Sequence, residues 1–150
     1  MKTLGNNDIL KRIKIGYFAS SKIASLSVLP TLDWANEIAK REDVAIISGF
    51  HSKLEREVLN YLLIGKCDII CVLARGIYKQ VPAKYKEAYV NNRILFISLE
   101  MENVNRSNRV TTKKRNEYIA SIADKLVFSS VTSESSLYEL TKARKETTFL

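Results

Sequence analysis

Five short runs of apolar residues constrain the fold of this chain more than any other feature. They cover residues 13–19, 44–48, 69–74, 94–98 and 126–131. Each run is rich in β-branched residues and is nearly continuous, whereas a strand with one solvated face would alternate. This pattern is typical of parallel strands that helices cover on both faces.

Segments with helical periodicity lie between these runs. Ser52-Lys53-Leu54-Glu55 has the spacing of a capping box, in which two side chains satisfy free amides at a helix start. The alternation predicts an α/β sandwich with a mostly parallel sheet of five to six strands. Residues 147–150 could add an edge strand. The predicted helices cover residues 29–41, 52–64, 82–90, 112–124 and 133–145.

The length of 150 residues fits a single domain spanning the whole chain. Residues 1–10 carry none of the patterned segments, so we expect them to be flexible. A hydrophobic content of 46% excludes disorder as a global description. No apolar run approaches the roughly 20 residues that span a bilayer, so we expect a cytoplasmic protein with no membrane partner.

The two cysteines, Cys67 and Cys71, lie in one short segment that includes the start of a predicted strand. Neighbouring positions on an extended strand bridge poorly, so we interpret both as reduced and buried. A redox or metal role is the alternative interpretation.

The net charge is 24 − 16 = +8, which favours a polyanionic partner such as nucleic acid, a nucleotide or an anionic surface. The segment 106–115 contains no acidic residue. It is either a ridge that contacts phosphates or a solvated helix face. Its basic residues are Arg106, Arg109, Lys113, Lys114 and Arg115.

Hydroxyl groups and glycine follow several of the predicted strands. In an open parallel sheet, ligands bind beyond the carboxyl ends of the strands, and helix N-termini there favour phosphate. Alternatively, these residues only cap helices. The third run is followed by Arg75. The candidate contacts are Ser20, Ser21 and Lys22 after the first run, Ser48, Gly49, Phe50 and His51 after the second, and Ser135 and Ser136 after the fifth.

No catalytic motif stands out. The chain lacks a Walker-type loop, a Gly-x-Ser-x-Gly elbow and a Gly-x-Gly-x-x-Gly turn. Nothing in the spacing of Glu55, Glu100 and Glu134 singles out an acid–base pair. We therefore expect a protein that is not an enzyme and needs no metal or cofactor. Tyr78, Tyr85 and Tyr89 could stack on bases, although the last two have the spacing of core residues.

An ordered set of segments resembles the DprA/Smf DNA-processing family. Val44-Ala45-Ile46-Ile47-Ser48-Gly49 resembles the strand and Ser-Gly-x-Ala-x-Gly-x-Asp turn at the family's centre. Residues 115–124 resemble its Arg-Asn-Arg-x-Ile-Ala-x-Leu-Ser-Asp segment, and Ser135-Ser136-Leu137 resembles its Ser-Gly-Ser-Leu turn. The residues around Gly16 lie where the family opens with Val-Gly-Ser-Arg. The resemblance covers nearly the whole chain.

This resemblance implies a Rossmann-like three-layer sandwich that binds single-stranded DNA in a basic pocket at the strand ends. It also implies transfer of DNA to a recombinase during uptake or repair, often by a homodimer. By position, Ser48 and Gly49 would face phosphates, Arg115 and Asn116 would line the pocket, and Ser135 and Ser136 would close it.

The chain departs from the family pattern at several charged positions. The family's Arg, second Gly and Asp fall on Ser52, Lys53 and Glu55, and a further family arginine falls on Glu117. The same fold binds phosphorylated nucleotide ligands in other proteins, so a nucleotide-binding or nucleotide-processing domain is the alternative. The Pro-Gly-Gly-x-Gly-Thr loop of the related phosphoribohydrolases is missing. A scaffold that binds only proteins is a third interpretation.

Overall fold

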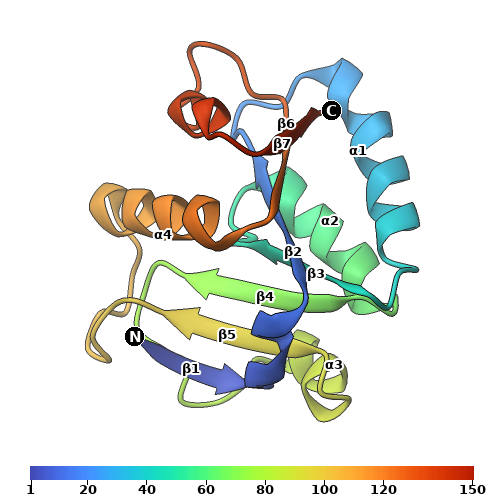
Figure 1. Cartoon of the computed structure of the whole chain (residues 1–150). Coiled ribbons are helices and arrows are strands. Elements are labelled where there is room, and N and C mark those ends of the chain that lie inside the picture. Colours follow the sequence, from blue (N-terminus) through green and yellow to red (C-terminus); the bar gives the residue numbers. More distant parts are fainter.

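A seven-stranded sheet runs through the centre of the computed structural model, which describes all 150 residues (Figure 1). The strand order is β1-β5-β4-β3-β2-β6-β7. All neighbouring strands are parallel except β1 and β5. The five predicted runs form β2 (Ile13–Ala19), β3 (Val44–Ser48), β4 (Asp68–Leu73), β5 (Ile94–Ser98) and β6 (Lys125–Ser129).

The sheet has two more strands than the five predicted runs, because a short strand is added at each edge. The predicted tail strand is confirmed as β7 (Glu146–Phe149), which pairs with β6. At the other edge, β1 (Lys2–Gly5) pairs with β5. A count of five to six strands was therefore too low. An edge strand of four residues with little burial has almost no apolar pattern that a sequence could reveal.

Residues 1–10, which we expected to be flexible, form β1 and most of the 3-10 helix η1 (Asn7–Lys11). Ile9 is 1% exposed and packs into the core, and the Asn6 amide donates to the Ile94 carbonyl at 3.1 Å. One buried side chain and the pairing with β5 hold this segment in place. Neither produces a periodic pattern.

The helices agree with the predicted segments in most places. Helices α1 (Ser25–Ile38) and α4 (Arg109–Ile122) each begin three or more residues before their predicted starts. The predicted capping box at α2 (Lys53–Leu63) is confirmed. Residues 82–90 form the short helices η2 (Ala83–Tyr85) and α3 (Lys86–Val90).

The predicted helix at residues 133–145 is wrong. Only Tyr138–Lys142 are helical there, as the 3-10 helix η3. The Ser135 hydroxyl accepts a hydrogen bond from the Thr132 amide at 3.0 Å. Such local bonds compete with helix formation in segments that are rich in Ser and Thr.

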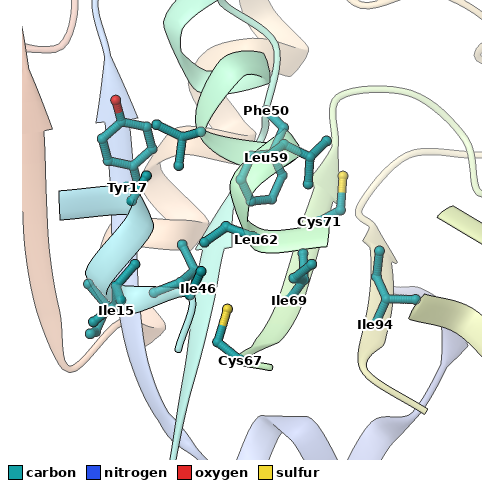
Figure 2. Packing of buried hydrophobic residues seen from close by; sticks show 14 of the residues in the cluster. Ile15, Tyr17, Ile46, Phe50, Leu59, Leu62, Cys67, Ile69, Cys71 and Ile94 are labelled. Atoms are coloured by element: carbon teal, nitrogen blue, oxygen red, sulfur yellow. The ribbon is translucent and has the colours of Figure 1, made fainter. Parts of the chain in front are cut away.

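The sheet is the middle of three layers, as expected for a Rossmann-like sandwich. One face carries α1, α2 and α3, and their apolar side chains pack on β2, β3, β4 and β5. Figure 2 shows Leu59 and Leu62 of α2 in this layer. The opposite face carries α4, η1 and η3. Cys67 and Cys71 are free and buried in the first of these layers (Figure 2). No helix combines the length and apolarity that crossing a membrane requires.

The connection from β5 to β6 changes faces and passes over the sheet through α4 (Figure 1). The chain therefore winds outward from β2 through β3, β4 and β5, and then returns to place β6 on the other side of β2. This topological switch point lies between β2 and β6, where ligands of open α/β sheets usually bind.

Candidate nucleic-acid interface at the strand ends

A cavity of about 480 Å³ lies beyond the carboxyl ends of β3 and β4, and we call it the basic cavity. Four of its lining residues are cationic, and none is acidic. Cations gathered from four separate segments create a strong positive potential in a concave site. Its lining residues are Gly49, Phe50, His51, Cys71, Leu73, Ala74, Arg75, Tyr78, Lys84, Tyr85, Asn105, Arg106, Ser107 and Arg115.

Arg115 forms the inner wall of the basic cavity and is only 6% exposed. A Cβ added at Gly49 would lie 2.5 Å from Arg115 Nη1 and 2.6 Å from its Nε. Glycine is therefore required for the guanidinium to lie against this turn. The Arg115 Nε donates to Asn116 Oδ1 at 3.1 Å, and Arg115 forms no ion pair. Burial lowers the pKa of Arg115, while the nearby Glu55 carboxylate opposes this shift.

Glu55 stabilises the turn between β3 and α2 through hydrogen bonds to backbone amides. Its carboxylate accepts hydrogen bonds from the amides of Ala19, His51 and Ser52 at 2.9, 2.9 and 3.1 Å. It therefore joins the end of β2 to the turn after β3. Phe50 has a φ of 48° in this turn, a conformation that non-glycine residues rarely adopt.

Aromatic rings support two of the cavity's cations. The Arg75 guanidinium lies 5.0 Å from the centre of the Tyr78 ring, and the Lys84 ammonium lies 5.0 Å from that of Tyr85. Both rings meet Phe96 edge to face. Tyr85 is 4% exposed and belongs to the core, as its spacing suggested, whereas Tyr78 is half-buried and lines the cavity. Tyr89 packs against the core and does not line the cavity.

A second cavity of about 600 Å³, the hydroxyl cavity, lies at the switch point between β2 and β6. The Ser135 and Ser20 hydroxyls are 3.4 Å apart, and Ser130 accepts from the Ala24 amide at 3.0 Å. Ser130 has a φ of 58°. Both cavities thus contain a strained residue just after a strand end. The polar residues lining the hydroxyl cavity are Ser20, Ser21, Lys22, Ser130, Thr132, Ser133, Glu134, Ser135 and Ser136.

A third cavity of about 540 Å³ lies between α4 and η3, and we call it the helix cavity. It shares Ser136 with the hydroxyl cavity. Its residue Asn116 bonds to Arg115 of the basic cavity. The helix cavity therefore adjoins both the hydroxyl cavity and the basic cavity. The residues of the helix cavity are Arg109, Thr112, Lys113, Asn116, Glu117, Ser136, Glu139 and Leu140.

Most of the predicted site residues lie in these cavities. Five of them line the hydroxyl cavity, and four line the basic cavity. Arg109, Lys113 and Asn116 line the helix cavity, which Ser136 of the hydroxyl cavity also lines. The residues of the hydroxyl cavity are Ser20, Ser21, Lys22, Ser135 and Ser136, and those of the basic cavity are Gly49, Phe50, His51 and Arg115.

Three predicted site residues lie outside all of these cavities. Gly16 lies in the middle of β2 beneath α4, where an added Cβ would be 3.0 Å from Leu126 Cδ2. Ser48 is fully buried, and its hydroxyl accepts from the Phe50 amide at 3.2 Å. The Lys114 ammonium donates to the Leu99 carbonyl at 3.2 Å and pairs with Glu100 at 3.3 Å. All three contact other parts of the protein, and their contact with nucleic acid stays a prediction.

The sequence interpretation missed the contribution of Arg75 and Lys84 to the basic cavity. Arg75 follows a strand end, which was a usable sign. Lys84 lies in a short 3-10 helix with no pattern that separates it from other surface lysines. Arg106 belongs to the basic segment, but nothing in the segment showed that it would face Arg115 across a cavity.

Two solved structures have the same arrangement of strands and helices. DNA processing protein A (DprA) from Streptococcus pneumoniae superposes with a TM-score of 0.76 and 16% identity, over 98% of this chain and 53% of that one. This chain has a DprA-like fold. DprA from Helicobacter pylori is described as binding single-stranded DNA. It superposes with a TM-score of 0.73 and 15% identity, over 93% of this chain and 64% of that one.

The chain spans about half to two thirds of the length of these DprA structures. No protein-family model matches the sequence, and no curated protein matches it. At this level of identity the structural likeness shows the fold.

Proposed function

We propose that this chain binds single-stranded DNA and acts as a DNA-processing protein of the DprA/Smf type. The observation that carries the proposal is the basic cavity, where four cations and no acid line a concave site at the strand ends. The DprA-like fold supports it, since the H. pylori protein is described as binding single-stranded DNA.

The basic cavity suits the phosphates of a flexible strand. Arg75 and Arg106 reach it from two turns, and their guanidinium groups can bind phosphate oxygens in pairs. Tyr78 offers a partly exposed ring to a base. The adjoining helix and hydroxyl cavities continue the site with Asn116 and Ser136, so a strand can extend beyond the basic cavity.

The wider role belongs to the same proposal. We infer that the protein acts without catalysis in the cytoplasm, in DNA uptake or recombination, and passes DNA to a recombinase as a homodimer. The support is the DprA-like fold together with the lack of a recognisable catalytic motif in the sequence.

The test is binding of a fluorescent 30-nucleotide single strand, with duplex DNA as competitor, at low and physiological salt. We expect binding that prefers the single strand and falls steeply with salt, with a log–log slope of about −0.7 per phosphate neutralised. Replacing Arg75 and Arg106 with alanine should weaken binding to all sequences alike and make the slope shallower.

The matched control replaces Lys40 and Lys66 with alanine. These lysines line a depression near the amino-terminal ends of β3 and β4, away from the basic cavity at their carboxyl ends. Their replacement changes the net charge by the same amount. If both double variants lose the same affinity, binding is set by overall charge and the basic cavity is not the site. Absence of binding at low salt would overturn the proposal.

The hydroxyl cavity favours a second candidate function, the binding of a small phosphorylated nucleotide. It lies at the switch point, and its polar lining consists of seven hydroxyl side chains, one lysine and the carboxylate of Glu134. A nucleotide that binds there should raise the melting temperature by mass action, while oligonucleotides have little effect. Ser135→Trp should abolish this shift by filling the cavity, and no shift with millimolar nucleotides would exclude this candidate.

A further inference from the structure

The wall of the basic cavity that carries Arg106 belongs to a long irregular segment between β5 and α4. This segment, residues 99–108, contains no regular secondary structure. Asn105, Arg106 and Ser107 line the cavity, and all three are exposed. An exposed loop can hold a cation over a cavity only if other contacts fix its path.

The start of the loop is fixed by α4. The Lys114 ammonium pairs with Glu100 at 3.3 Å and donates to the Leu99 carbonyl at 3.2 Å. The Glu100 side chain is 15% exposed, so it is far better shielded from water than most ion-pair partners in this protein. The Glu100 amide also donates to the Ser98 hydroxyl at 3.1 Å.

The middle of the loop rests on the turn after β4. The Gly76 amide donates to the Val104 carbonyl at 2.7 Å. A Cβ at Gly76 would lie 2.6 Å from the Met101 carbonyl oxygen, so the loop approaches this turn as closely as a glycine permits. Glu102 forms an ion pair with Lys2 of β1.

The end of the loop is the start of α4. Asn108 caps the helix, and its side chain accepts from the Thr111 amide at 2.9 Å. Between this cap and the bond at Val104, only residues 105–107 are left to line the cavity. Arg106 is therefore positioned by contacts on both sides of it.

We propose that Glu100 is a positioning residue for nucleic-acid binding: its ion pair with Lys114 holds the loop 99–108 so that Arg106 closes the basic cavity. The proposal rests on the proposed function. Lys114 thus acts through the loop, although its place in the basic segment suggested a contact with phosphate.

The proposal makes a prediction whose sign is opposite to that of simple electrostatics. Removing an acidic residue near a phosphate-binding site should strengthen binding if charge alone matters. We expect Glu100→Gln to weaken binding of a 30-nucleotide oligo(dT) about fivefold, the effect of losing one ion pair in which Glu100 is shielded and Lys114 is half-exposed. The control Glu87→Gln changes the net charge equally at an exposed residue of α3 that forms no ion pair, and it should not weaken binding.

Reversing the pair separates positioning from direct contact. Lys114→Glu alone should weaken binding more than Glu100→Gln does, because it adds a negative charge and repels Glu100. The double variant Glu100→Lys with Lys114→Glu keeps the net charge and restores the pair, so it should bind within about twofold of the unchanged chain. A double variant as weak as Lys114→Glu would overturn the proposal, as would a Glu100→Gln variant that binds as tightly as the unchanged chain.

Hydrogen exchange of the Gly76 amide tests the loop without DNA. This amide is bonded to Val104, so release of the loop should make it exchange faster in Glu100→Gln while the amides of β3 and β4 stay protected. Unchanged exchange at Gly76 would overturn the proposal whatever the binding result. If the unchanged chain binds no DNA but Gly76 exchanges faster in the variant, the proposed function fails and the positioning of the loop by Glu100 stands.

Discussion

At the end of β3, the buried guanidinium of Arg115 lies so close to Gly49 that a side chain at this glycine would collide with it. Arg115 is almost fully buried without an ion pair, and its guanidinium lies against Gly49. A buried cation is costly unless something solvates it. The Asn116 side chain and the nearby Glu55 provide part of this solvation, and a phosphate in the basic cavity would provide more.

Gly49→Ala should displace the Arg115 guanidinium from the cavity wall. We expect DNA binding to weaken about tenfold, since one charge-assisted hydrogen bond contributes roughly 1.5–3 kcal/mol. Overpacking should also lower the free energy of unfolding by about 1–3 kcal/mol. Fluorescence binding and urea unfolding measure the two effects.

Gly16→Ala is the matched control, since Gly16 is buried beneath α4 and lines none of the three cavities. It should lower the free energy of unfolding by a similar amount and leave DNA binding unchanged. If Gly16→Ala weakened binding as much as Gly49→Ala, the loss would come from lower stability alone.

At the scale of elements, the start of α2 shows how one carboxylate organises two turns. Glu55 completes the capping box with Ser52 and also accepts a bond from Ala19, at the end of a different strand. The spacing of Ser52 and Glu55 predicted the capping box. The sequence did not predict the hydrogen bond from the Ala19 amide, because this bond depends on β2 and β3 being neighbours.

Glu55→Gln should destabilise the protein more than Ser52→Ala. Glutamine places an amide donor among three amide donors, which leaves buried groups unpaired at a cost of about 2–3 kcal/mol. Loss of the Ser52 cap should cost about 1 kcal/mol. Equal losses in urea unfolding would show that the bond from Glu55 to Ala19 contributes nothing.

The thiols at β4 predict a pH dependence of stability. Burial raises the pKa of Cys67 to about 11 and that of Cys71 to about 12, above the ordinary value of 9.0. The folded protein therefore binds more protons than the unfolded chain above pH 9. The contribution of the two buried thiols to the free energy of unfolding is complete below pH 9 and is lost as the pH rises through 11 and 12.

Urea unfolding between pH 8 and 10.5 should thus show a free energy of unfolding that falls above pH 9. A variant with Cys67→Ala and Cys71→Ala should show a smaller fall over this range, although its stability at pH 8 differs. An identical fall in both proteins would assign the effect to the buried tyrosines, such as Tyr17, whose pKa is also raised by burial.

At the scale of the whole molecule, the net charge of +8 is partly concentrated at one edge of the sheet. Like charges repel in the folded state, and salt screens this repulsion. The ten ion pairs are mostly exposed and contribute little. The basic cavity should therefore favour binding at the expense of stability.

Raising the salt concentration from 20 to 300 mM should raise the melting temperature by roughly 2–4 °C, as expected for about 1 kcal/mol in a chain of this size. Replacing Arg75 and Arg106 with glutamine should remove more of this increase than the same replacement of Lys40 and Lys66. Calorimetry at both salt concentrations measures the difference. A melting temperature that falls with salt would show that the ion pairs outweigh the repulsion.

Local patterns in the amino-acid sequence predicted the five central strands, the capping box of α2, the edge strand at the C-terminus and the α/β class. These features follow from local patterns, because burial on both faces and helix capping depend on residues close together in the chain. The hydroxyl groups and glycine at the strand ends were found for the same reason, since parallel strands bring their carboxyl ends to one edge.

The tertiary structure alone decided how the candidate site is divided. Lys114 and Arg115 are neighbours in the chain, but successive helix residues point about 100° apart, so one holds a loop and the other lines a cavity. Arg75, Lys84 and Arg106 join Arg115 only because β3, β4 and α4 pack together. Such contacts depend on which distant segments meet, and no local pattern encodes that.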